Sequence, residues 1–199
     1  MKHIAQLLSV ALCAIMVAGC QTDTTCDLQK AGTTTLSVSI AETRTALGEK
    51  SNDTYPVYWS EGDCIAVNGK KSEAVAINAE DKTRATFTIN SVLKYPYLIT
   101  YPHTASTTTE SPRVVFPAEQ SYTEGSFAPE SAPMCAYAME NSNSIALKHL
   151  AGVLRLAVRS KEGEATTLRT VKITSERAIS GEFEVDCQSA TITPTEGCG

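Results

Sequence analysis

The chain has 199 residues and a formal net charge of -5. Hydrophobic residues make up 42% of it and charged residues 20%, which allows a buried core and excludes a disordered composition. The acidic balance argues against nucleic acid as a partner, because proteins that bind nucleic acid usually carry a basic surface.

The first 20 residues, MKHIAQLLSVALCAIMVAGC, predict a secretory signal. Their apolar run, Ile4–Ala18, is too short to cross a bilayer comfortably and ends in small residues. We expect residues 1–19 to be a signal peptide. The ending VAGC resembles the bacterial lipobox, and this resemblance implies that the chain is cleaved between Gly19 and Cys20 and that Cys20 carries a lipid anchor. The alternatives are an ordinary signal peptide with a chance cysteine and an uncleaved anchor.

A short tether and a strand are predicted to follow the signal. Residues 20–32 are polar and short of apolar side chains, as is typical of a tether. The next stretch is TTTLSVSIAETRTALG, in which Leu36, Val38 and Ile40 alternate with serines. Such alternation predicts a half-buried strand. The bond from Arg44 to Thr45 lies just after that strand.

Short β-strands are predicted along most of the remaining chain. Asn68-Gly69 indicates a tight turn, because both residues tolerate a positive φ. Prolines flank the alternating segment Tyr97–Tyr101, which suits a strand because proline cannot donate within a sheet. The strands expected after the first are Cys64–Val67, Ala74–Ile77, Ala85–Ile89, Tyr97–Tyr101, Val114–Phe116, Leu168–Thr174, Gly181–Asp186 and Ala190–Thr193.

The longest apolar segment after the signal is SIALKHLAGVLRLAVR, residues 144–159. Its apolar residues fit one face of a helix moderately well. However, Leu154, Leu156 and Val158 also alternate with more polar neighbours. The sequence therefore favours a strand, a bend near Ala151-Gly152 and a second strand over an amphipathic helix.

Many short strands and few helical stretches predict an all-β protein built from β-sandwiches. We expect an N-terminal β-sandwich domain at residues 33–140 and the start of a second β-sandwich domain at residues 141–199. The second part has too few predicted strands for a complete sandwich. We therefore expect a longer protein that continues beyond Gly199.

No motif for catalysis or cofactor binding is present, so we expect neither an enzyme nor a cofactor or metal site. The chain has no GxSxG, P-loop or GxGxxG sequence. His103 and His149 have no partner at the spacing of metal ligands or of a catalytic base. Export permits disulfides, but five cysteines beyond Cys20 form no CxxC pair, and their pairing cannot be assigned from sequence. They are Cys26, Cys64, Cys135, Cys187 and Cys198.

Seven segments together resemble one known family. In chain order they are VAGC at 17–20, ETRT at 42–45, VYWSEGDCIAVNGK at 57–70, YPYLITYP at 95–102, FPAEQSY at 116–122, PMCAYA at 133–138 and LKHLAGVLRLAV at 147–158. Taken together, they resemble the fimbrillin family, the Mfa-like lipoprotein subunits of Bacteroidales-type fimbriae. Cys64 and Cys135 depart from what that family leads us to expect.

The resemblance implies a fold, a location and a mode of assembly. It implies two transthyretin-like β-sandwich domains and a lipoprotein of the outer membrane, with other fimbrial subunits and host or bacterial surface ligands as partners. It also implies that an Arg-specific protease cuts between Arg44 and Thr45. That cut would remove the first strand, whose apolar face is Leu36, Val38 and Ile40. An extended segment from the C-terminal end of another subunit would then fill the groove.

Other interpretations remain open on the sequence alone. An arginine at a strand end is common for structural reasons, so Arg44 is equally well explained as a solvated residue. The chain is also consistent with a monomeric surface lipoprotein that binds glycan or a host ligand. In that case Tyr55, Tyr58, Trp59 and Tyr101 would stack on sugars, although packing in a core explains them equally well. An exported enzyme is the third class.

Overall fold

The computed structural model describes residues 32–41, 57–121, 131–140, 142, 145–152, 154, 156, 158, 161, 163 and 167–199. Apart from a 3-10 turn at Ser131, every regular element within these residues is a β-strand, so the predicted all-β class is confirmed. In the same residues, no helix has the length and hydropathy needed to cross a membrane.

The strands form two sheets. One has eight strands in the order β3-β2-β6-β8-β9-β1-β5-β4, and the other has three in the order β11-β10-β7. The strands are β1 (Thr34–Ile40), β2 (Ala66–Val67), β3 (Lys70–Lys71), β4 (Ala76–Ile77), β5 (Arg84–Ile89), β6 (Tyr97–Tyr101), β7 (Arg113–Phe116), β8 (Met134–Ala138), β9 (Ile145–His149), β10 (Gly181–Asp186) and β11 (Thr191–Pro194).

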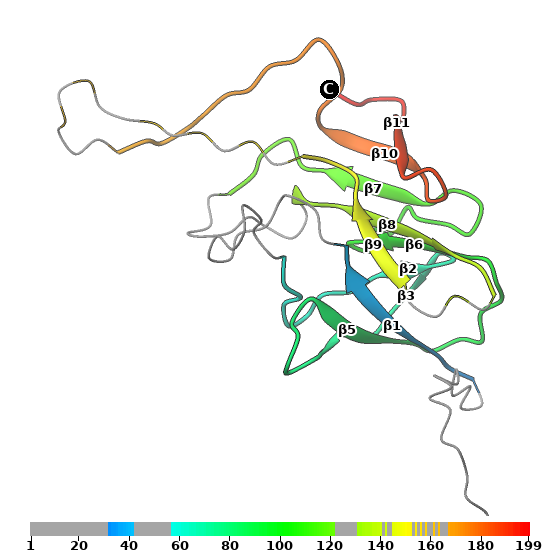
Figure 1. Ribbon diagram of the computed structural model, residues 1–199. Helices are drawn as coiled ribbons and strands as arrows, with labels where there is room; N and C mark the ends of the chain where they lie inside the picture. Colours follow the sequence, from blue (N-terminus) through cyan, green and yellow to red (C-terminus); the bar gives the residue numbers. More distant parts are fainter. Residues whose placement is uncertain are drawn as a thin grey trace, which may run out of the picture.

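The large sheet curls, so that the fold has three layers. In Figure 1, β1 and β5 lie below β6 and β8, and the small sheet of β7, β10 and β11 lies above them. The middle layer is therefore covered on both faces. Successive residues of β8 show this, because Met134 packs into the core below while Cys135 packs into the core above.

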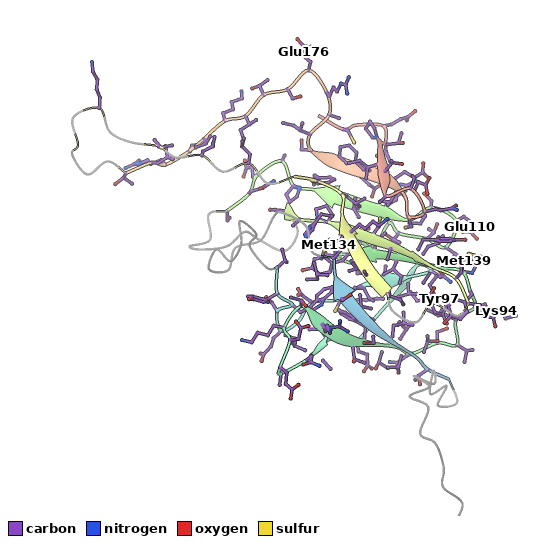
Figure 2. The ribbon with its side chains drawn as sticks, viewed as in Figure 1. Lys94, Tyr97, Glu110, Met134, Met139 and Glu176 are labelled. Atoms are coloured by element: carbon purple, nitrogen blue, oxygen red, sulfur yellow. The ribbon has the colours of Figure 1, made fainter. Side chains whose placement is uncertain are left out.

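Two hydrophobic cores lie on opposite faces of the middle layer. The lower core contains most of the large buried side chains, including Trp59, Phe87, Ile99 and Leu147. The upper core is smaller, and its buried members are Val114, Phe116, Cys135, Phe183, Val185 and Cys187. In Figure 2, Met134 lies within the body of the fold, consistent with an exposed fraction of 1%.

The tight turn predicted at Asn68-Gly69 is confirmed. Both residues have positive φ, 48° and 71°, and they join β2 to β3. The side chain of Asn68 accepts a hydrogen bond from the Leu98 amide at 2.8 Å. A Cβ on Gly69 would lie only 2.8 Å from the backbone of Thr108, so this position requires glycine for two reasons.

Two predicted strands are absent from the described residues. Leu154, Leu156 and Val158 lie in no strand and are 66%, 52% and 62% exposed. The predicted strand Leu168–Thr174 is also wrong, since residues 167–175 lie in no strand. Residues 167–175 belong to a segment that extends away from the body (orange in Figure 1), and Glu176 lies where that segment bends back toward β10 (labelled in Figure 2). Without a paired strand, alternation alone does not make a sheet.

Two other predicted strands are shorter than expected. The expected strand Cys64–Val67 is reduced to Ala66–Val67. The amide of Ile65 donates to the hydroxyl of Ser72 at 3.0 Å instead of to a backbone carbonyl, which interrupts the ladder. The expected strand Ala74–Ile77 is likewise reduced to Ala76–Ile77.

Strands on either side of residue 140 pair with one another. β9 lies beside β8 and β1, and β7 lies beside β10. Residues 33–140 and 141–199 therefore share sheets in this structure, and their division into two domains stays a prediction.

Candidate functional site

The first strand, β1, lies in a groove between two other strands. It pairs with β5 in antiparallel register at six positions, from Thr34↔Ile89 to Ser39↔Arg84. On its other side it pairs with β9 in parallel register at three positions. β1 is thus an interior strand whose main-chain ladder is supplied from both sides.

The predicted apolar face of β1 points into the lower core. Leu36, Val38 and Ile40 are 3%, 1% and 8% exposed, whereas Ser37 between them is exposed. The structure therefore brings these three predicted residues together on one buried face. Period-2 alternation produces this arrangement because successive side chains of a strand point to opposite faces.

Hydrogen bonds hold both ends of β1. At the start, the hydroxyl of Thr34 donates to the Ser91 carbonyl at 2.8 Å and accepts from the Leu93 amide at 3.0 Å. At the end, the amide of Ala41 donates to the Leu147 carbonyl at 2.8 Å. Sequence analysis did not identify Thr34 as an anchoring residue. Its only signal was a polar residue at a buried position of the alternation.

The other predicted site residues lie outside the described part of the chain. These are Gly19 and Cys20, at the expected signal cleavage and lipidation site, and Arg44 and Thr45, at the expected processing site. Ala41 is the last described residue before the segment that contains Arg44.

The groove around β1 is suited to accepting a strand. β5 and β9 would each present unpaired main-chain groups if β1 left, and the lower core would lose the side chains of Leu36, Val38 and Ile40. Burying each such side chain contributes about 1.5–3 kcal/mol. Three of them together approach the roughly 5–15 kcal/mol by which a whole domain is stable, so an emptied groove would need another strand.

A second feature is an open hollow of about 380 Å³ beside the end of β6. The Asp63 carboxylate, at its edge, accepts hydrogen bonds from the Tyr101 hydroxyl at 2.9 Å and from the Ser60 amide at 2.8 Å. Burial raises the pKa of Asp63, and these two hydrogen bonds oppose the rise. Burial also lowers the pKa of His103, with a further contribution from Lys71. Asp63 thus serves to fix the turn against β6.

The aromatic residues suggested for sugar stacking are mostly in the core. Trp59 is 3% exposed and packs edge-on against Phe87 and Tyr101, with ring centroids 5.0 and 5.3 Å apart. Tyr101 is itself 5% exposed, whereas Tyr58 is 48% exposed. Tyr55 lies outside the described residues. Core packing therefore accounts for Trp59 and Tyr101.

No group of three or more His, Cys, Asp or Glu side chains gathers as a metal site in the described ranges. Searches with the whole chain found no matching protein-family model, no matching curated protein and no matching solved structure.

Proposed function

We propose that this chain is an exported, lipid-anchored structural subunit of a fimbria-like surface fibre, assembled by strand exchange at the position of β1. The observation that carries the proposal is the place of β1: a strand near the start of the chain fills a groove between β5 and β9. We further propose that the fold is a transthyretin-like β-sandwich, as the fimbrillin resemblance implies.

Strand exchange at β1 needs no chemistry beyond main-chain pairing and pocket filling. An incoming strand would restore the ladder with β5, and its alternate side chains would take the places of Leu36, Val38 and Ile40. Thr34 and Ala41 mark the ends of the ladder that it must replace. A contact in which one subunit donates and the next accepts is heterologous, so repeating it builds a filament.

Release of β1 requires a cut between it and the rest of the fold. β1 ends at Ile40, and the next described segment starts at Val57. Arg44 lies between them, so a cut after Arg44 would separate the lipidated tether and β1 from the body in one step. The membrane would then keep the anchor, while the body would be free to join a neighbour.

The test is to treat the purified full-length precursor with an Arg-specific protease. We expect a new N-terminus at Thr45 and a ladder of oligomers that resists detergent without heating. The Arg44→Ala variant should keep β1 and remain monomeric. Lys50→Ala is the matched control, because Lys50 is a basic residue in the same segment and its side chain is not recognised by the protease. It should behave as wild type.

Two results would count against the proposal. One is an Arg44→Ala precursor that polymerises as readily as wild type. The other is a chain cut at Arg44 that loses β1 and stays monomeric at every concentration, which would favour the monomeric surface lipoprotein.

The membrane anchor has its own test. We expect the Cys20→Ala variant to lose incorporated palmitate and to leave the membrane fraction, because several acyl chains are needed for stable attachment. Cys26→Ala, six residues further on, should keep both. Equal palmitate in the two variants would contradict lipidation at Cys20.

A further inference from the structure

Two cysteines that are far apart in the sequence meet in the upper core. Cys135 lies in β8, in the middle layer, and is 0% exposed. Cys187 follows directly after β10, in the small sheet, and is 5% exposed. Both belong to the same buried cluster as Phe116 and Phe183. The two side chains therefore approach each other across the boundary between two layers.

The register of the middle layer places Cys187 near Cys135. The Sγ of Cys187 lies 3.6 Å from the carbonyl oxygen of Ile99, in β6. β6 pairs with β8 so that Ile99 faces Ala136 and Thr100 faces Cys135. Neighbouring strands are about 4.8 Å apart, so a sulfur above Ile99 is within reach of Cys135.

Each thiol also affects the ionisation of the other. Interaction with the Cys187 thiol lowers the pKa of Cys135, and the nearby Lys148 contributes in the same direction. Interaction with the Cys135 thiol, together with burial, raises the pKa of Cys187. Both shifts agree with two thiols that are neighbours in the upper core.

We propose that Cys135 and Cys187 form a disulfide that fastens the small sheet to the middle layer. The electron acceptor is a disulfide, either a small one such as oxidised glutathione or that of a thiol oxidoreductase. One cysteine thiolate attacks it and releases a thiol, and the second cysteine thiolate then attacks the mixed disulfide and releases the other. The chain loses two protons and two electrons, and the acceptor becomes two thiols.

The remaining described cysteines are poorly placed to compete. The Sγ of Cys198 donates to the Glu182 carbonyl at 2.8 Å, near the opposite end of β10. Five residues of strand, about 16 Å, separate that carbonyl from Cys187. The Sγ of Cys64 donates to the Gly62 carbonyl at 3.4 Å, beside the hollow at the end of β6. The geometry therefore selects one pairing.

The disulfide is independent of strand exchange. It lies in the upper core, whereas β1 packs into the lower core on the other face of the middle layer. A subunit could replace β1 and keep the bond intact. The bond would hold β10 and β11 in place while the lower core is rebuilt.

Peptide mapping of the exported full-length chain tests the pairing. The chain is denatured with N-ethylmaleimide present to block free thiols, and is then digested with trypsin and a glutamyl endopeptidase. Cutting after Glu196 separates Cys187 from Cys198. We expect a linked pair of peptides containing Cys135 and Cys187, lighter by two hydrogen atoms than the sum of the two, that separates on reduction.

Single variants and one control sharpen the result. Cys135→Ala should leave Cys187 fully reactive with N-ethylmaleimide after denaturation, and Cys187→Ala should do the same for Cys135. Cys64→Ala should leave the linked peptides unchanged. If the Cys135→Ala or Cys187→Ala variant fails to fold, the peptide map of the wild-type chain still tests the pairing. Wild-type chain that carries maleimide on both Cys135 and Cys187, even after exposure to oxidised glutathione, would overturn the proposal. So would a map in which Cys135 is linked to Cys64 or Cys198.

Discussion

Two regions of this chain carry the same apolar alternation, but only one of them forms a buried strand. In β1, Leu36, Val38 and Ile40 are at most 8% exposed. In the segment after β9, Leu154 and Val158 are more than 60% exposed. The side chains are of the same kind and have the same spacing. What differs is the surroundings, because β1 has a strand on each side and a core beneath it.

The difference teaches that alternation describes a capacity for pairing, not the pairing itself. A strand of this type becomes part of a sheet only where partners supply main-chain hydrogen bonds and a face to cover. β1 receives both from β5 and β9. The proposed strand exchange at β1 relies on the same dependence, because an incoming strand would have to pair with β5 and β9 and cover the same face.

The largest expected difference in the free energy of unfolding is between two variants, each of which lacks one apolar side chain from one of the two regions. Leu36→Ala should lower the free energy of unfolding by about 2–5 kcal/mol, because it removes buried methyl groups and leaves a cavity. Leu156→Ala should change it by less than about 0.5 kcal/mol, because that side chain is mostly exposed. Urea denaturation followed by fluorescence of the single tryptophan, the buried Trp59, measures both. Equal losses in the two variants would break the comparison.

A smaller effect is expected from the hydroxyl that anchors β1. Thr34→Val keeps the shape of the side chain but removes the hydrogen bonds to Ser91 and Leu93, leaving a partly buried amide without its acceptor. We expect a loss of about 1–3 kcal/mol in the free energy of unfolding. Thr174→Val, at an exposed position of the other region, is the matched control and should be close to neutral. A neutral Thr34→Val would show that β1 is held by its ladder and apolar face alone.

Much of the fold could be predicted from local pattern. The alternation in β5 and the Asn68-Gly69 turn each depend on residues close together in sequence, and both predictions are confirmed. β8 was not predicted as a strand, and the reason is physical. In the sequence MCAYA, Met134 faces the lower core and Cys135 the upper one, so neither face is polar and no alternation marks the strand.

The parts that could not be predicted depend on long-range contacts. The parallel pairing of β9 with β1 joins residues more than 100 positions apart and leaves no local signal. The meeting of Cys135 and Cys187 is of the same kind, because it depends on how the small sheet docks on the middle layer. The apolar face of the candidate site was therefore predictable, whereas the pairing of β5 and β9 with β1, which forms its groove, was not.

The smallest expected effect concerns His149, at the end of the strand that borders β1. Its Nε2 is buried with no hydrogen-bond partner in the described part of the chain, and burial lowers its pKa below the ordinary 6.5. The folded chain thus keeps His149 neutral, while the unfolded chain binds a proton below about pH 6.5. Stability is full above that pH and falls as the pH drops toward the folded-state pKa.

Denaturation midpoints measured in steps from about pH 7.5 to about pH 5.5 test this dependence on either side of the ordinary histidine pKa. We expect the midpoint of the wild type to fall across this range and that of His149→Gln to fall less. His103 has a pKa lowered by burial and by Lys71, so it contributes to the slope with the same sign. The double variant with His103→Gln should be the flattest. Glu182 and Asp186 have lowered pKa values, so their effects appear only under more acidic conditions. A His149→Gln slope equal to that of the wild type would mean that the chain beside β1 is open enough to accept the proton without unfolding.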